Sequence, residues 1–275
     1  MIHRTGLAGV LGGALLLCAG QAPAAISWVF DSSPNSGYTT VDTTSVKQTA
    51  GGVEVVALGL SNTDNGISGT GTAARGTTNI ANTTGYRLES AYLTVYDGGI
   101  GTKNWDAASA TSGYGDNSEN GSPEHTVDNN QRYDSVLFSF ASAIKLTTVN
   151  IGWYSGDTDI SVLRYDGIGA TPSDNPVGKT YGEVLTSGWT LVSQAATSST
   201  TSKDLSGVAG SSKWLIGAAN PLLGTTMDGT IDQVKLISLV GSLPGLPPST
   251  VVPEPGSLAL FGLALVGMVA RRRLT

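Results

Sequence analysis

The stretch SVLFSFASAIKLTTVNIGW, residues 135–153, decides the fold class. Apolar side chains occupy alternate positions over 136–140, which is the period-2 pattern of a β-strand with one buried face. A second run begins at 144–146 and continues over 149–153 in the opposite phase. The slip at Thr147-Thr148 indicates a β-bulge or a bend, because one extra residue moves the following side chains to the other face.

The same alternation recurs on both sides of this stretch. Further strands are expected at 53–57, 91–96, 159–165, 188–192, 213–217 and 231–240. Clusters of Gly, Asn and Asp separate the runs, and the body has no convincing helical pattern of about ten residues. Short strands joined by turns predict an all-β fold, an antiparallel two-sheet sandwich of the jelly-roll type. Trp153, Trp189 and Trp214 lie in strand patterns and are expected in its core.

Composition narrows the classes of function. Only 13% of the residues are charged, about half of the roughly 25% in ordinary soluble domains. Four of the 15 basic and one of the 21 acidic residues lie in the predicted targeting ends, which leaves the body a net charge of −9. An acidic body without a basic cluster argues against nucleic-acid binding and suits solubility or cation binding. The only cysteine, Cys18, falls in the front segment, which excludes a disulfide scaffold and a thiol nucleophile from the body.

The front end has the three parts of a secretory signal peptide. A polar start at His3-Arg4 precedes an apolar run over 7–19, and Ala22-Pro23-Ala24 is a small-x-small cleavage site. Residues 1–24 are therefore predicted to form a signal helix that engages the general secretion machinery and is removed by signal peptidase after Ala24. An uncleaved membrane anchor is the alternative, but the run is short for a membrane span.

The back end consists of a spacer, a short motif and a membrane segment. Residues 241–252 form a Pro-rich spacer, and Pro253-Glu254-Pro255 follows in an extended form that a processing enzyme can bind. Residues 257–270 are a predicted transmembrane helix of about 21 Å, shorter than the hydrocarbon core of about 30 Å. The closing arginines, 271–273, should stay on the cytoplasmic side, so the body lies on the far side. A weak span suits a segment that is removed later.

This end of the chain, about Val252 to Thr275, resembles the PEP-CTERM sorting signal, with a Pro-Glu-Pro motif, a short hydrophobic helix and a terminal arginine cluster in that order. The resemblance implies recognition by an exosortase, an integral-membrane cysteine transpeptidase, in a Gram-negative host that makes exopolysaccharide. It also implies that the sorting residues act in recognition and not in catalysis. They are Pro253, Glu254, Pro255, Arg271, Arg272 and Arg273. An ordinary C-terminal tail anchor is the alternative.

Six blocks of the body carry a second resemblance. They are Glu124–Asn129, Tyr133–Phe138, Ile151–Trp153, Gly156–Val162, Trp214–Ala218 and Asp232–Leu236. Over about Ile26 to Val240, the chain is similar to a family of exosortase-dependent surface proteins. The resemblance implies a secreted, single-domain surface protein without an assigned enzyme activity, and it brings no catalytic residue with it.

The candidate ligand residues lie in an acidic stretch, 97–134, and in the turn around residue 158. Hard cations such as Ca²⁺ take oxygen ligands from carboxylates, amides and backbone carbonyls. Asp128, Asn129, Asp157 and Asp159 are therefore the candidates for a structural Ca²⁺ or ligand loop, although no EF-hand spacing is present. No other cofactor is expected. The alternative is a solvated acidic loop in which Asp and Asn cap turns.

Aromatic and acid–base residues give the remaining candidates. Trp105 and Tyr114 lie in the acidic stretch, where they can stack on sugar rings or take part in ordinary packing. His125 is the only histidine of the body, and nothing resembles a nucleophile elbow that would use it. Asp157 and Asp159 can act as a glycosidase pair if their carboxyl groups lie about 5–9 Å apart, or they can cap the turn between two strands.

These features favour a non-enzymatic surface or matrix protein that an exosortase sorts and that associates with exopolysaccharide or a biofilm. The chain is expected to cross the inner membrane, to pass through a membrane-anchored precursor, and to end at the cell surface or outside the cell. A carbohydrate-binding module, with or without Ca²⁺, is the first alternative, and a polysaccharide hydrolase is the second.

Overall fold

The computed structural model describes residues 24–32, 40–64, 85–104, 126–130, 132–194, 200–224 and 228–244. These residues belong to one compact unit, Ala24–Pro244, which contains the predicted body. The predicted signal helix, transmembrane helix and sorting residues lie outside the described residues. Within the described part of the chain, no helix has the length and apolar character that a membrane crossing requires.

The described body is built almost entirely from strands. In chain order they are β1 (Ile26–Val29), β2 (Thr40–Thr43), β3 (Val46–Ala50), β4 (Val53–Asp64), β5 (Arg87–Tyr96), β6 (Gly99–Lys103), β7 (Val127–Asp128), β8 (Asp134–Gly156), β9 (Ile160–Tyr165), β10 (Trp189–Gln194), β11 (Ser202–Asp204), β12 (Ser211–Ala218) and β13 (Asp232–Ser242). One short α-helix, α1 (Tyr181–Thr186), and one 3₁₀ helix, η2 (Pro221–Leu223), join them.

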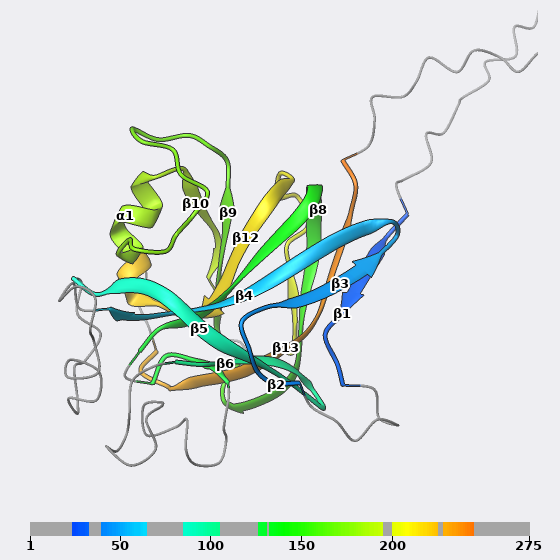
Figure 1. Cartoon of the computed structure of the whole chain (residues 1–275), viewed down its shortest axis with the longest axis horizontal. Helices are drawn as coiled ribbons and strands as arrows, with labels where there is room; N and C mark the ends of the chain where they lie inside the picture. The colour runs from blue at the N-terminus through cyan, green and yellow to red at the C-terminus, as the bar shows by residue number, and fades with distance from the viewer. Residues whose placement is uncertain are drawn as a thin grey trace, which may run out of the picture. The chain divides into compact units, whose positions relative to one another are not determined.

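Five of these strands close into an antiparallel barrel. Around the ring β13 pairs with β6, β6 with β5, β5 with β4, β4 with β8, and β8 again with β13 (Figure 1). The expected all-β, antiparallel character is confirmed. The expected two-sheet jelly-roll sandwich is corrected, because the described strands form one continuous sheet that closes on itself. Alternation in a sequence reports which face of a strand is buried, and a sandwich and a small barrel bury the same faces.

Strand β8 belongs to two parts of the sheet at once. Its first part, 134–140, lies between β4 and β12, and its second part, 145–156, pairs with β13 and β11. Thr147 and Gly152 have no partner opposite them on β13. The bulge at Thr147 confirms the slip predicted from the sequence, and the two predicted runs are one strand.

Trp153 departs from the expectation that it lies in the core. The extra residue at Gly152 shifts the side-chain phase, so Trp153 is only half-buried and lies on the outer face. There the Nζ of Lys235 lies 5.2 Å from the Trp153 ring centre and 4.0 Å from the ring centre of Tyr96. The prediction failed because the residue that shifts the phase is a glycine, and a glycine does not change the pattern of apolar residues from which the strand was predicted.

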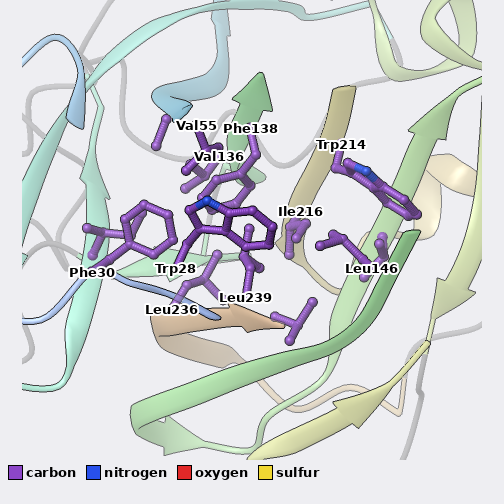
Figure 2. Packing of buried hydrophobic residues seen from close by; sticks show 14 of the residues in the cluster. Trp28, Phe30, Val55, Val136, Phe138, Leu146, Trp214, Ile216, Leu236 and Leu239 are labelled. Atoms are coloured by element: carbon purple, nitrogen blue, oxygen red, sulfur yellow. The ribbon is translucent and has the colours of Figure 1, made fainter. Parts of the chain in front are cut away.

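The barrel interior is filled by an apolar cluster around Trp28 (Figure 2). Its labelled members are Trp28, Phe30, Val55, Val136, Phe138, Leu146, Trp214, Ile216, Leu236 and Leu239. The Trp28 ring packs edge-on to Phe140 with 4.9 Å between ring centres, and its Nε1 donates a 2.9 Å hydrogen bond to the Val53 carbonyl. Trp214 is fully buried in this cluster, as expected.

Strands β12, β9 and β10 extend the sheet from β8, and a second apolar cluster packs there against α1. Trp189 lies in this second cluster, as expected, together with Tyr181 and Val184 of the helix. A capping box begins the helix: Thr180 Oγ1 accepts from the Glu183 amide at 3.2 Å, and Glu183 accepts from the Thr180 amide at 2.9 Å. A helix of six residues depends on such a cap and on packing, because isolated helices of this length do not form in water.

Candidate functional site

Three aspartates from distant parts of the chain converge at one edge of the barrel. Asp157 follows β8, Asp159 precedes β9, and Asp232 is the first residue of β13. Each offers a carboxylate oxygen, and these oxygens lie within 4.8 Å of one another. We call Asp157, Asp159 and Asp232 the acidic cluster.

The backbone at the end of β8 allows this convergence. Gly156 has φ +76°, a left-handed conformation that side chains rarely adopt, and a Cβ atom there would overlap the carbonyl oxygen of Ile231. The close approach brings Asp157 beside Asp232, where the two residues form an isolated parallel bridge. Glycine at this position is therefore part of how the fold builds the acidic cluster.

Backbone and amide groups hold the carboxylates in place. The Asp159 amide donates to Asp232 Oδ1 at 3.0 Å and to Asp157 Oδ1 at 3.3 Å. Asn129 exchanges two hydrogen bonds with Asp232: its Nδ2 donates to Asp232 Oδ2 at 2.6 Å, and its Oδ1 accepts from the Asp232 amide at 2.9 Å. Asp159, Asp232 and Asn129 are buried and Asp157 is partly buried, so these hydrogen bonds are largely shielded from solvent.

Burial sets the protonation of the cluster. Desolvation, with the hydrogen bond to Asp157 and repulsion from its charge, raises the pKa of Asp232 to about 9. The raised pKa favours the protonated form of Asp232, which is hydrogen-bonded to Asp157. Close carboxylates otherwise repel each other, and one proton removes that repulsion.

A buried lysine next to the acidic cluster supplies a positive charge. Lys203 of β11 is largely buried, and its Nζ donates a 2.9 Å hydrogen bond to Thr158 Oγ1. Burial lowers the pKa of Lys203, while the charges of Asp159, Asp157 and Asp232 act in the opposite direction. One ammonium group and one proton thus offset two of the three negative charges that the aspartates can carry.

The geometry of the acidic cluster suits either a bound divalent cation or a proton on Asp232. Carboxylate and amide oxygens at this spacing are the ligands that a hard divalent cation takes, and a cation can replace the proton of Asp232. Without a cation, the proton and Lys203 stabilise the same arrangement. The two states differ in one measurable property, because cation binding would release a proton.

The structure brings together three of the four residues predicted from the sequence for a cation or ligand loop. Asn129, Asp157 and Asp159 lie at the cluster, whereas the Asp128 carboxylate accepts from Thr126 Oγ1 and from the Asn130 amide, both at 3.0 Å. Those contacts are the turn capping that was the alternative for this loop. The bond from the Asp159 amide to Asp157 is also a local Asx contact, so capping and convergence occur in the same turn.

Asp232 was not predicted from the sequence. It lies 73 positions after Asp159 and 103 after Asn129. Only its place at the start of a strand, after the turn at Asp228-Gly229, marks it in the sequence. The pairing of β13 with β7 and β8 brings it to the cluster.

The other predicted site residues lie outside the described part of the chain. They are Trp105, Tyr114, His125, Ala22, Pro253, Glu254, Pro255, Arg271, Arg272 and Arg273. Ala24, at the predicted cleavage site, is described and exposed, two positions before β1.

A second buried polar group lies in the barrel, at the start of β8. Asp134 accepts hydrogen bonds from Thr102 Oγ1 at 2.9 Å and from Asn104 Nδ2 at 3.4 Å, and Thr102 Oγ1 also lies 3.0 Å from the Thr126 carbonyl oxygen. Tyr181 donates from its hydroxyl to the Tyr133 carbonyl at 3.0 Å. These contacts join β6, β8 and α1, which gives the group a structural role.

Comparison with known proteins identifies the C-terminal segment. Residues 251–273 match the model of the PEP-CTERM protein-sorting motif, as the resemblance in the sequence implied. No curated protein and no solved structure matches the chain. The motif implies an exported protein that an exosortase processes and sorts to the cell surface.

Proposed function

We propose that the barrel is a non-enzymatic domain that exosortase sorting displays at the cell surface, where it associates with exopolysaccharide or a biofilm matrix. The observation that carries this proposal is the sorting motif at 251–273, which follows directly on the folded body and its spacer. The second resemblance, to exosortase-dependent surface proteins, supports the same assignment. A polymer is a suitable partner because it can bind along an outer surface and requires no internal cavity.

The packing of the barrel supports an outer binding surface. Trp28, Phe30 and Phe138 lie in the interior with other buried apolar residues, as expected for a barrel of so few strands. A ligand must therefore contact the outside of the sheet or the loops. The residues proposed for sugar stacking, Trp105 and Tyr114, belong to one of those loops in the sequence.

The geometry of the acidic cluster argues against a polysaccharide hydrolase. Glycosidases hold their two carboxyl groups about 5–9 Å apart, with space for a sugar between them. Here the oxygens lie within 4.8 Å, and Asp159 and Asp232 are 2% and 1% exposed. Carboxyl groups packed this closely and this deeply suit a structural or cation-holding role.

A second candidate function is a calcium-dependent carbohydrate-binding module. The convergence of Asp157, Asp159 and Asp232 favours it, because a cation there would fix the loop before β8, the turn after it and the start of β13. In this version Ca²⁺ shapes the surface that contacts the polymer. The proposal without calcium uses the same surface with a proton in the cluster.

The proposed function also includes a route from export to the cell surface. Signal peptidase removes residues 1–24 after export across the inner membrane, residues 257–270 hold the precursor in the membrane, and the exosortase then removes the sorting tail. The mature form at the cell surface is the barrel with part of its spacer. Its partners are therefore the secretion machinery, the signal peptidase, the exosortase, the membrane for a limited time, and the exopolysaccharide.

The test uses the full chain in an exporting host that has an exosortase. Intact mass of the protein recovered from the cell surface should correspond to a chain that starts after Ala24 and lacks the tail. Replacement of Glu254 by Ala should leave the tail attached, whereas Glu54→Ala, at an exposed position of β4, should not affect processing. The recovered protein should be retained by the host exopolysaccharide, and a lack of retention at millimolar sugar would contradict the binding role while leaving the sorting role intact.

A further inference from the structure

The first and last strands of the body lie side by side and antiparallel. Ile26 of β1 faces Gly241 of β13, and Val29 faces Ser238. The chain therefore enters the barrel at Ile26 next to the place where it leaves at Ser242 (Figure 1). Both predicted processing sites are connected to this one edge of the body.

Strand β1 is packed into the barrel from its first residue. The Ile26 side chain packs against the main core and so closely over the Gly51 turn that a Cβ on Gly51 would lie 2.9 Å from it. Trp28 is fully buried, and the Phe30 amide donates a 2.8 Å hydrogen bond to the Ile237 carbonyl. Residues 26–30 therefore cannot leave β13 without exposing core.

The predicted leader cleavage site lies two positions before this strand. Two residues span about 7 Å at most. A protease that binds its substrate as an extended strand needs free backbone groups on both sides of the bond that it cuts. After Ala24, those groups belong to Ala25, Ile26 and Ser27, and the last two are paired with β13 in the closed barrel.

The sorting motif has no such restriction. Pro253 lies 11 positions after Ser242, and a chain of that length can reach about 36 Å. Pro244, Pro247 and Pro248 fall within this stretch and oppose helix formation, which would shorten its reach. An enzyme can therefore bind the motif while β13 keeps all of its pairings.

We propose that the two ends are processed in a fixed order relative to folding: the leader is cut before β1 docks on β13, and the sorting tail is cut from the closed barrel. This order rests on the proposed function, because it requires leader removal after Ala24 and tail removal by an exosortase. Docking of β1 on β13 then follows leader removal, and it protects the new N-terminus. A precursor in which β1 docks too early would retain its leader.

A redox lock on β1 tests the first half of this order. Ser27 and Val240 face each other across β1 and β13 with outward side chains, and the body has no cysteine of its own. Facing residues of antiparallel strands lie within the Cα separation that a disulfide needs. The full-length precursor with Ser27→Cys and Val240→Cys, and with Cys18→Ala in the leader, is purified in detergent, oxidised or reduced, and treated with signal peptidase.

We expect the oxidised precursor to be cut at least tenfold more slowly than the reduced one. A version with six Gly and Ser residues inserted between Ala25 and Ile26 should be cut equally fast in both states. The single variant Ser27→Cys controls for the substitution. Equal cutting of the oxidised and reduced precursors without the insertion would overturn the order. Failure to cut any precursor after Ala24 would instead overturn the proposed function on which the order depends.

Shortening the spacer tests the second half. Deletion of residues 245–250 leaves the sorting motif close to β13, so tail removal in cells should fall severalfold while leader removal is unchanged. Replacement of the same six residues by Gly and Ser keeps the length and should retain tail removal. Normal tail removal after the deletion would show that the exosortase does not need the length of the spacer to reach the motif. The proposal that the tail is cut from the closed barrel would then be wrong.

Discussion

Asn129 and Asp232 lie 103 positions apart and exchange two hydrogen bonds, through the Asn129 amide group and the backbone amide and carboxyl of Asp232. This pairing ties the loop before β8 to the first residue of β13. It also keeps Asp232 beside Asp157 and Asp159. The stability of this edge of the barrel should therefore depend on pH, on divalent cations and on the backbone that shapes it.

The first prediction concerns pH. The folded-state pKa of Asp232 is raised from 3.8 to about 9, so between these values the folded protein retains a proton that the unfolded chain has lost. Stability attributable to this group is full below pH 3.8 and falls as pH rises towards about 9, by up to about 1.4 kcal/mol per pH unit.

Asp232→Asn tests this pH dependence because an amide resembles a protonated carboxyl group and does not ionise. Urea unfolding at pH 5, 7 and 8.5 should show the stability of the wild type falling relative to that of the variant. Asp204→Asn is the matched control, since the exposed Asp204 has its pKa lowered by hydrogen bonds to Ser206. Parallel pH curves for wild type and Asp232→Asn would contradict the prediction.

The second prediction concerns divalent cations. If Ca²⁺ replaces the shared proton, Ca²⁺ at 100 times its Kd should stabilise the fold by about 2.7 kcal/mol and release protons on binding. Calorimetry in buffers of different ionisation enthalpy measures both effects. Asp159→Asn should abolish the stabilisation, while Asp128→Asn should retain it, because Asp128 caps its own turn. An unchanged melting temperature after EDTA treatment of the metal-loaded protein would exclude a structural cation.

The third prediction concerns the core. Trp28→Ala should destabilise the barrel by about 3–5 kcal/mol, because it removes a fully buried ring, its contact with Phe140 and its hydrogen bond to Val53. Trp153→Ala removes the same side chain from the outer face and should cost clearly less. Urea unfolding of both variants measures the difference, and equal losses would mean that Trp153 has a buried role.

The fourth prediction concerns the turn that forms the acidic cluster. Gly156→Ala should destabilise the fold by more than about 1 kcal/mol, because the new Cβ meets the Ile231 carbonyl in addition to the strain of a positive φ. Gly178→Ala is a close control: φ is +78° there, and nothing lies within 4 Å of the added Cβ. The difference between the two losses in free energy of unfolding measures the cost of the contact with Ile231. Equal losses would mean that β8 and the chain before β13 move apart without cost to make room for the Cβ.

The sequence was most informative where structure depends on neighbouring residues. The alternation over 136–140 and the slip at Thr147 are local signals, and both are found in β8. The closed barrel was missed because closure depends on β13 pairing with β8 and β6, which alternation does not report. Trp153 was misplaced because the bulge at Gly152 carries no apolar pattern.

The candidate site shows the same division. Asp157 and Asp159 are two positions apart, so their shared turn could be predicted as a unit. Asn129 was predicted from its acidic, amide-rich surroundings and not from contact with those two residues. Asp232 reaches the cluster only through the register of β13 with β7 and β8, which is a property of the folded sheet.

The pairing of β13 also determines how the domain responds to force. A pull on the chain beyond Ser242 acts along the axis of β13, which pairs with β8 over its whole length and with β1 beside its end. Force in that direction shears many hydrogen bonds together, whereas a pull across the strand would open them one after another. A barrel with its last strand in this position is suited to withstand tension that is applied through its C-terminal side.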